Sequence, residues 1–430
     1  MGPPNSRGRS CIYFIESRTE PLPTLLTVNN YFYPRGGADV LFLEQMRLFQ
    51  KLGWRVLPFC MQHENNLATV WSDYFVDEIE FGRIYSAWEK IGRIPKIVYS
   101  LESRRKLDNL LRVARVDICH VHNLYHHISP SILSLLKERG VPTVLTLHDL
   151  KLACPAYKML THDGICERCK PRKVFNVAVH RCIKNSLALS FLVFIESALH
   201  LLLGTYRHCV DRFVAPSRFL ISKMREWGWD PERFVYVPNF VDVDSYRSDC
   251  GGVGRAFLYF GRLAAEKGLQ TLIKAAARAA VPVWIAGTGP EEAALRRLVA
   301  STGYDVNFLG YLTGDALRDA VRASRATVLP SECYENAPMS VLESYACGRP
   351  VIGAAIGGIP ELIREGETGV TFQSASVESL AGALRRFADE PDSRLTEMGR
   401  YGRRWVESDF TRQKYLEGLL TLYGNLGVRL

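Results

Sequence analysis

Short β-rich runs alternate with helical stretches along most of the 430-residue chain. Parallel strands need a long crossover between them, usually a helix, so this alternation predicts parallel sheets covered by helices. The strands that we expect lie at 24–28, 54–60, 116–121, 142–147, 211–215 and 234–237, and again at 256–260, 282–286, 305–309, 326–329 and 350–353. Because the pattern occurs twice, it predicts an α/β protein with two doubly wound lobes.

The two lobes should meet near residues 244–254, where Gly, Ser and Asp cluster and no apolar period survives. Beyond about residue 376 the chain is expected to be helical, and its last helix is long enough to return across the boundary. In such folds ligands bind outside the carboxyl ends of the strands, here the cleft between the lobes. The expected segments are a flexible leader (1–23), a first domain (24–246) with an insertion (150–210), a second domain (254–405) and a C-terminal helix (406–430).

Lys and Arg outnumber Asp and Glu by 54 to 45, and the net charge of +9 suits an anionic partner such as a phosphate-bearing ligand or an acidic membrane surface. Aromatic residues rarely interleave with the basic ones, so no nucleic-acid partner is expected. The chain has eleven cysteines, an odd number, and its first apolar run, CIYFI, is too short for a signal peptide. We therefore expect a cytoplasmic protein.

Two glutamates, Glu335 and Glu343, stand eight residues apart in PSECYENAPMSVLESYACGRPVIG. If the first lies in the loop before a helix and the second two turns inside it, both carboxylates face the cleft and can accept hydrogen bonds from paired sugar hydroxyls. An isolated pair of this kind would ordinarily be a solvated pair on a helix. The amides at the start of the helix would favour an anion or sugar oxygens, and they belong to Asn336, Ala337, Met339 and Ser340.

The expected strand AFLYF is followed by Gly261-Arg262 and then by Glu266-Lys267-Gly268. A diphosphate at the end of this strand would be bound by both residues, by Arg262 through its planar guanidinium and by Lys267 through its ammonium charge. Two cations there would stabilise the charge that develops on a departing nucleotide. Taken alone, an Arg and a Lys near a helix start are common surface residues.

In the first half, the strand at 24–28 leads into NNYFYPRGGAD and then a helix. Gly36 and Gly37 would let the backbone approach phosphate oxygens at that helix N-terminus. At the end of another strand, TLHDL places His148 at the cleft, although a lone histidine is more often a satisfied structural residue. The same structural interpretation applies to the four histidines of HVHNLYHH (120–127).

Together these motifs resemble those of retaining glycosyltransferases of the GT-B fold, family 4 type. The resemblance covers roughly residues 24–425, and its most specific part is the E-x7-E element followed by YACGRPV. GRLAAEKG, VPNFVD, IAGTGPEE and PRGGAD also have the order and spacing typical of the family. The resemblance implies two facing Rossmann-like domains, the first on the acceptor side and the second binding a nucleotide sugar, with a C-terminal helix that returns to the first.

The resemblance also implies roles for the motif residues. Glu343 would hold the nucleotide ribose, while Glu335 and the amides after it would hold the hexose. Arg262 and Lys267 would neutralise the diphosphate, helped by the Gly36–Gly37 loop. No catalytic cofactor or divalent metal is implied.

His148 would face the donor sugar near the reacting carbon. Two departures from the family pattern concern the donor. The run Asn336-Ala337-Pro338-Met339 replaces a commoner glycine-rich version, and Asp39 stands where Glu is frequent.

The implied activity is transfer of a hexose, with retention, from a nucleotide-diphosphate sugar to a sugar or lipid-linked sugar acceptor in cell-surface polysaccharide biosynthesis. Two alternatives are another GT-B activity, such as a phosphorylase or nucleotide-sugar epimerase, and a non-enzymatic nucleotide-sugar-binding scaffold. A hydride-transfer enzyme is disfavoured, because Gly287-Thr288-Gly289 is followed by Glu292 where the dinucleotide fingerprint needs a small residue.

The insertion contains a CxxC pair flanked by two further cysteines, with His162 and His180 alongside. Four thiolates could form a tetrahedral site, which favours structural zinc, with an iron–sulfur cluster or four reduced thiols as alternatives. The four residues are Cys154, Cys166, Cys169 and Cys182.

Residues 187–203 (LALSFLVFIESALHLLL) hold thirteen apolar residues out of seventeen. The polar residues fall within one sector of about 120°, which predicts an amphipathic helix and not a membrane span. Basic stretches at 83–115 and 151–184 precede it. This combination fits a protein that lies peripherally on an anionic cytoplasmic membrane face, although the helix could instead pack internally above a solvated basic surface.

Overall fold

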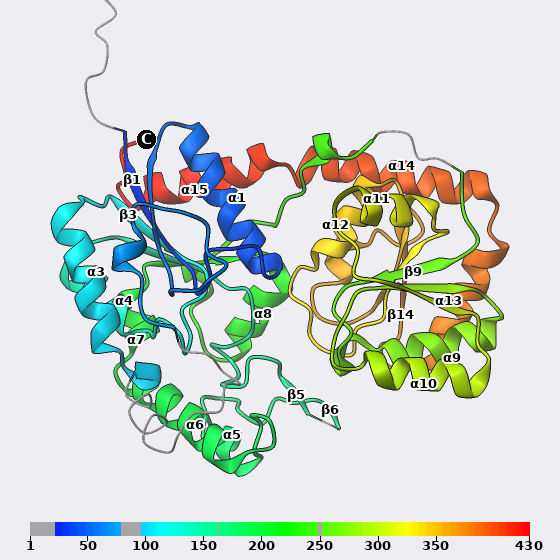
Figure 1. The fold of residues 1–430 in the computed structure, drawn as a ribbon, viewed down its shortest axis with the longest axis horizontal. Coiled ribbons are helices and arrows are strands. Elements are labelled where there is room, and N and C mark those ends of the chain that lie inside the picture. The colour runs from blue at the N-terminus through cyan, green and yellow to red at the C-terminus, as the bar shows by residue number, and fades with distance from the viewer. Residues whose placement is uncertain (1–21, 79–95, 162, 248–251) are drawn as a thin grey trace, which may run out of the picture.

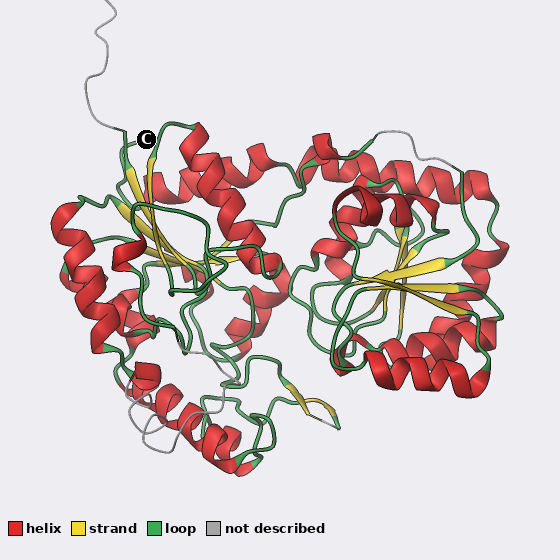
Figure 2. Cartoon of the chain, in the orientation of Figure 1, coloured by secondary structure: helices red, strands yellow, loops and turns green. Residues whose placement is uncertain are grey.

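The computed structural model describes residues 22–78, 96–161, 163–247 and 252–430. Each half of the chain forms a lobe around a six-stranded parallel sheet with helices on both faces, and the lobes stand side by side (Figures 1 and 2). The predicted doubly wound two-lobe fold is confirmed. The expected leader lies outside the described residues except for its last two, and the expected lobe boundary lies partly outside them.

The first lobe contains six parallel strands in the order β2-β1-β3-β4-β7-β8. The order changes direction between β1 and β3, which is where such a sheet opens a crevice. Its strands are β1 (Thr24–Val28), β2 (Arg55–Phe59), β3 (Ile118–Val121), β4 (Thr143–Thr146), β7 (Arg212–Ala215) and β8 (Phe234–Tyr236). Its covering helices include α1 (Gly37–Lys51), α3 (Leu101–Val113), α4 (Ser131–Glu138), α7 (Thr205–Cys209) and α8 (Arg218–Glu226).

The second lobe has the strand order β11-β10-β9-β12-β13-β14, with its switch point between β9 and β12. Its strands are β9 (Phe257–Phe260), β10 (Val283–Ala286), β11 (Val306–Gly310), β12 (Thr327–Leu329), β13 (Val351–Ala354) and β14 (Gly369–Phe372). Its helices include α9 (Leu269–Ala279), α10 (Glu292–Thr302), α11 (Gly314–Ala323), α12 (Met339–Ala346), α13 (Val377–Asp389) and α14 (Asp392–Asp409).

All eleven expected strands are present, with ends within two residues of those expected. Most of them are buried on both faces, as β1 shows with all five residues buried, so hydropathy marks them clearly, whereas the edge strand β11 is only partly buried. The sequence analysis missed β14, which has only four residues, begins with Gly and pairs with β13 at the edge of the sheet.

The insertion after β4 forms a separate small layer below the first lobe (Figure 2). It contains a two-stranded hairpin that projects toward the second lobe, where Lys158 Nζ lies 2.8 Å from Glu266 Oε1. The elements of the insertion are β5 (Leu160–Thr161), β6 (Gly164–Ile165), α5 (Asn176–Val179) and α6 (Leu187–Leu202).

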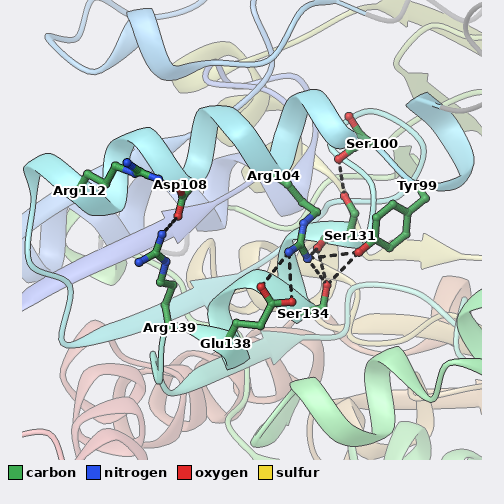
Figure 3. Close-up of polar contacts among 9 residues, drawn as sticks. All are labelled: Tyr99, Ser100, Arg104, Asp108, Arg112, Ser131, Ser134, Glu138 and Arg139. Carbon is green, nitrogen blue, oxygen red and sulfur yellow. Dashed lines mark hydrogen bonds and ion pairs between the residues drawn. The ribbon is translucent and has the colours of Figure 1, made fainter.

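Polar side chains fasten α3 to α4 on the outer side of the first lobe (Figure 3). The Arg104 guanidinium donates to both carboxylate oxygens of Glu138, at 3.1 and 2.8 Å, and to Ser134 Oγ at 2.6 Å. Asp108 accepts from Arg112 on the same helix and from Arg139 just beyond α4. These contacts are far from the strand ends that form the cleft, so we assign them to the scaffold.

The last helix, α15 (Arg412–Asn425), leaves α14 and crosses from the second lobe to the first (Figure 1). Its inward residues Tyr415, Leu419 and Tyr423 are buried in the same apolar cluster as Phe49 and Trp54. The predicted return of the C-terminal helix to the first lobe is confirmed. The core of the first lobe is therefore completed by the last segment of the chain.

We predict that Leu419→Ala destabilises the first lobe by about 2–5 kcal/mol, because Leu419 is fully buried and the substitution leaves a cavity. Denaturant unfolding followed by circular dichroism measures the change. Leu420→Ala, one position along the same helix and only half-buried, is the matched control and should cost clearly less. Equal, small losses for both variants would mean that α15 does not stabilise the first lobe.

Candidate active site

Loops from both lobes meet at the carboxyl ends of the two sheets (Figure 1). The first lobe contributes the loop after β1, which leads into α1, and the loop after β4, which carries His148. The second lobe contributes the loop after β9, which carries Arg262 and Lys267, and the segment 330–338 between β12 and α12. Strand–helix alternation determines this placement, because every parallel strand delivers its next loop to the same edge of its sheet.

Lys267 and Glu335 form an ion pair at this edge, with 2.5 Å between Nζ and Oε1. The same carboxylate oxygen accepts a hydrogen bond from Ser331 Oγ at 2.7 Å. Burial would lower the pKa of the Lys267 ammonium, but the adjacent carboxylate outweighs that effect and raises the pKa above its ordinary value. Lys267 is therefore a fixed positive charge, half-buried beside the cleft.

Asn336 joins the two lobes through its side-chain amide. Its Nδ2 donates to the carbonyl of Leu147 at 2.8 Å, and its Oδ1 accepts from Ser217 Oγ at 2.6 Å. Leu147 immediately precedes His148. The segment that begins α12 is therefore held directly against the loop that carries His148.

The backbone of this segment is closely packed. The amide of Gly358 donates to the carbonyl of Glu335 at 2.8 Å, and a Cβ on Gly358 would lie only 1.9 Å from the carbonyl oxygen of Asn336. The Ala337 carbonyl accepts from Asn239 Nδ2 at 3.0 Å. These contacts leave little freedom to the loop, so the groups that it carries are held in fixed positions.

Glu343 lies inside α12, which Met339 and Ser340 begin. Burial raises the pKa of the Glu343 carboxyl above its ordinary value. Within the described ranges this carboxylate has no hydrogen bond or ion pair. It differs in this respect from Glu335, and a ligand with hydroxyl donors would satisfy it.

At the first lobe, Gly36 and Gly37 form the exposed turn at the start of α1. A side chain at Gly37 would meet open space, so the turn is accessible to a ligand. Behind it, Asp39 is buried and accepts from Asn29 Nδ2 at 2.8 Å, and burial raises the pKa of its carboxyl. Asn29 Oδ1 in turn accepts from Asn123 Nδ2 at 3.0 Å, which holds the loop after β1 against the end of β3.

His148 stands at one end of a column of three stacked imidazoles. Its ring centroid lies 5.2 Å from that of His122, which lies 4.8 Å from that of His120. Burial lowers the pKa of His148 to about 4 and that of His120 to about 3, and it takes the pKa of His122 well below its ordinary value. All three rings are therefore neutral at pH 7.

A chain of hydrogen bonds decides which nitrogen of His148 carries the proton. Tyr415 OH donates to Gln45 Oε1 at 2.8 Å, and the same oxygen lies 3.0 Å from His122 Nε2. Because an amide oxygen only accepts, His122 carries its proton on Nε2 and accepts on Nδ1. His148 Nε2 lies 3.0 Å from that Nδ1, so it must be the donor. His148 is then left with an unprotonated Nδ1, a hydrogen-bond acceptor.

Among the predicted residues, the structure brings Lys267 and Glu335 into contact and places Asn336 against the His148 loop. The Arg262 side chain is exposed, with no hydrogen bond or ion pair inside the described part of the chain. The sequence analysis missed Ser331, Ser217 and Gln45. Ser331 stands four residues before Glu335 and could have been noticed, whereas the other two are brought in from distant parts of the chain by the fold.

The four cysteines of the insertion, with His180, line one small cavity. Hydrogen bonding to Cys169 lowers the pKa of the Cys154 thiol to about 7. However, the described residues contain no group of three or more His, Cys, Asp or Glu side chains arranged to hold a metal ion, and His162 lies outside them. Zinc therefore stays a prediction from the cysteine spacing.

Comparison with known proteins defines the class. Residues 35–245 match the protein family described as Glycosyltransferase Family 4, and residues 254–405 match the family described as Glycosyl transferases group 1. The fold is similar to that of sucrose-phosphate synthase from Thermosynechococcus elongatus, with a TM-score of 0.69 at 18% identity over 94% of this chain and 99% of the other. The two lobes have the GT-B fold of glycosyltransferases. The chain belongs to the family 4 type of these enzymes.

Two curated relatives illustrate the similarity in sequence. The D-inositol 3-phosphate glycosyltransferase of Rhodococcus erythropolis is 31% identical over 51% of this chain and 54% of its own length. A GDP-mannose-dependent monoacylated alpha-(1-6)-phosphatidylinositol monomannoside mannosyltransferase of Corynebacterium glutamicum is 33% identical over 47% of this chain and 59% of its own length. The chain thus spans little more than half the length of these relatives.

The neutral histidine column predicts that the protein loses stability as the pH falls from about 6.5 toward about 4. In that window the unfolded chain binds protons on these histidines and the folded chain does not, so acid favours unfolding. His120→Gln should reduce the slope by about one proton, or about 1.4 kcal/mol per pH unit. Denaturant unfolding at several pH values measures it. His208→Gln, at an exposed histidine, should leave the slope unchanged, and equal slopes in both variants would contradict the prediction.

The cysteine spacing predicts about one zinc per chain in protein purified without added metal. Elemental analysis of the wild type measures it, and substitution of Cys166 and Cys169 by Ser should remove the metal. Substitution of Cys347, which is buried in the second lobe, is the control and should retain it. Metal-free wild-type protein would leave four reduced thiols as the correct interpretation.

Proposed function

We propose that this protein transfers a hexose, with retention of configuration, from a nucleotide-diphosphate sugar to a hydroxyl of a sugar or lipid-linked sugar acceptor. The observation that carries the proposal is the Lys267–Glu335 ion pair. Glu335 lies on the loop that Asn336 fastens to the carbonyl of Leu147, the residue before His148. A fixed cation, a carboxylate and a neutral imidazole are thereby collected at the edges of the two sheets that face each other.

The second lobe would bind the donor. The half-buried Glu343 carboxylate lacks protein donors in the described residues, and the vicinal hydroxyls of a ribose would supply them. Lys267 and the exposed Arg262 would contact the diphosphate, with the open turn at Gly36 and Gly37 on the other side. Cations in these positions counter the charge that grows on the leaving diphosphate, so they act more strongly in the transition state than on the bound donor.

The hexose would lie between Glu335 and His148. The carboxylate of Glu335 already accepts from Lys267 and Ser331 on one oxygen, which leaves the other for sugar hydroxyls. The unprotonated Nδ1 of His148 would accept from another hydroxyl of the same ring. Attack by the acceptor on the face that the diphosphate leaves would give retention, and the departing phosphate oxygen would take the acceptor proton.

The relatives support this class of substrate. One is named as dependent on GDP-mannose and acts on an acylated phosphatidylinositol monomannoside, and the other acts on an inositol phosphate. From them we propose a nucleotide-sugar donor for this chain. A cytoplasmic site of action and a role in assembling cell-surface polysaccharide are proposed from the sequence motifs alone. No helix in the described ranges is long and apolar enough to cross a membrane.

We predict that Arg262→Ala, Lys267→Ala and Glu335→Ala each reduce turnover by about 10²–10³-fold, because each removes a contact to charge or hydroxyls in the transition state. Hydrolysis of a panel of nucleotide sugars measures this without an acceptor, and NMR of the released sugar gives the anomer first formed.

Lys274→Ala, at an exposed lysine on α9, is the matched control and should keep the wild-type rate. Thermal unfolding of all variants shows whether the fold persists. Near-normal rates in all three site variants, on a donor that the wild type hydrolyses, would contradict the site assignment.

A further inference from the structure

Helix α6 (Leu187–Leu202) buries mostly polar residues and exposes apolar ones, the reverse of the usual arrangement for a helix in water. Its buried residues are Ser190, Val193, Glu196 and His200, three of them polar. Every exposed residue of the helix is apolar: Leu187, Ala188, Leu189, Phe191, Ile195, Leu201 and Leu202. A surface helix normally buries its apolar face, so this orientation requires an explanation.

Satisfied polar contacts hold the helix in this orientation. Glu196 Oε2 lies 2.9 Å from Lys151 Nζ, and both side chains are almost fully buried, with 1% and 4% exposure. His200 contacts the Val98 carbonyl at 2.8 Å and Thr205 Oγ1 at 3.0 Å. Rotating the helix to bury its leucines would break these contacts and leave a buried charge unpaired, at a high cost.

The apolar surface extends beyond the helix itself. Leu202 is 86% exposed, Leu187 56% and Phe191 51%. Phe175 and Val179, from the turn that packs on α6, add further exposed apolar surface, as does Leu203 just after the helix. Isolated apolar residues on a surface are ordinary, but a helix whose whole exposed face is apolar marks an interaction surface. We call this surface the α6 face.

Positive charge accompanies the α6 face. Four exposed cations lie in the segment just before the helix, and within the described residues none of them forms an ion pair: Arg172, Lys173, Arg181 and Lys184. Arg172 and Arg207 also line a cavity of about 80 Å³ beside Leu201. Burial lowers the pKa of Arg207, and repulsion from Arg172 and Arg233 lowers it further. The dominant charges around Arg207 are therefore positive, and a nearby anion would be attracted to them.

We propose that the α6 face docks on an anionic lipid bilayer, with its leucines and phenylalanines at the boundary of the acyl chains and the preceding cations against the headgroups. An amphipathic helix with apolar and basic parts binds such an interface parallel to its plane. A protein partner would need polar groups to fix its register, and the exposed residues of α6 offer none.

The docked face is connected to the candidate active site. Lys151 forms an ion pair with Glu196 of α6. The backbone amide of Lys151 also donates to Asp149 Oδ1 at 2.8 Å, and Asp149 is the residue that follows His148. A helix held at the bilayer surface is therefore attached to the loop that carries His148. If the proposed function holds, this attachment places the first lobe where a lipid-linked acceptor is presented; the docking itself does not depend on that function.

Co-sedimentation of the full chain with vesicles tests the proposal, without any nucleotide sugar. We expect binding to vesicles of phosphatidylcholine with phosphatidylglycerol, and weak binding to phosphatidylcholine alone. Phe191→Ser and Leu202→Ser should each weaken binding by about tenfold, because each removes the burial of one large apolar side chain. The double variant Arg181→Glu with Lys184→Glu should also weaken vesicle binding, and its loss should be larger at low salt than at high salt because salt screens the attraction to the headgroups.

Leu52→Ser is the matched control, because this leucine is 42% exposed just after α1, a helix that lies on the opposite side of the first lobe from α6 (Figure 1). Circular dichroism verifies that each variant is folded. The proposal is overturned if the wild type ignores lipid charge, or if the α6 variants sediment like the control. It is also overturned if light scattering shows a dimer that Phe191→Ser converts to a monomer, since a second copy would then cover the α6 face. Loss of donor hydrolysis with vesicle binding intact would refute the proposed function alone.

Discussion

A side-chain amide that bridges the two lobes holds the groups of the candidate site together. Asn336 donates to the backbone of one first-lobe loop and accepts from Ser217 at the start of α8. An amide can serve both purposes because it carries a donor and an acceptor on one planar group. A second-lobe loop thereby becomes part of the same rigid assembly as His148. Without such contacts, the Lys267–Glu335 pair and the imidazole would belong to two separately moving bodies.

The proton arrangement at His148 depends on residues far from the cleft. Tyr415, on the crossing helix, orients the Gln45 amide, which determines the tautomer of His122 and then that of His148. Each member of this chain is buried or nearly so, and burial keeps the rings neutral. Tyr415, a buried tyrosine of α15, therefore contributes to the chemistry of the site as well as to the core.

The sequence predicts the fold well because its signals are local. Most of the eleven expected strands are buried apolar runs, and the loops that follow them fall at the cleft by topology alone. Glu335 and Lys267 were identifiable because each stands in a motif next to a strand end. Contacts such as that of Gln45 with Tyr415 join positions far apart in sequence, so no local pattern reveals them. The polar sector of residues 187–203 was visible, but a helical wheel does not say which sector faces inward; the buried Lys151 decides that.

The crossing of α15 also has a consequence for how the protein is made. This helix is synthesised after the whole second lobe, yet it supplies Leu419 and Leu422 to the core of the first. On the ribosome, the second lobe can therefore finish folding before the first lobe, although its residues emerge later. Until α15 packs, Phe49 and Trp54 lack part of their apolar cover, so the first lobe keeps apolar surface open to solvent during that interval.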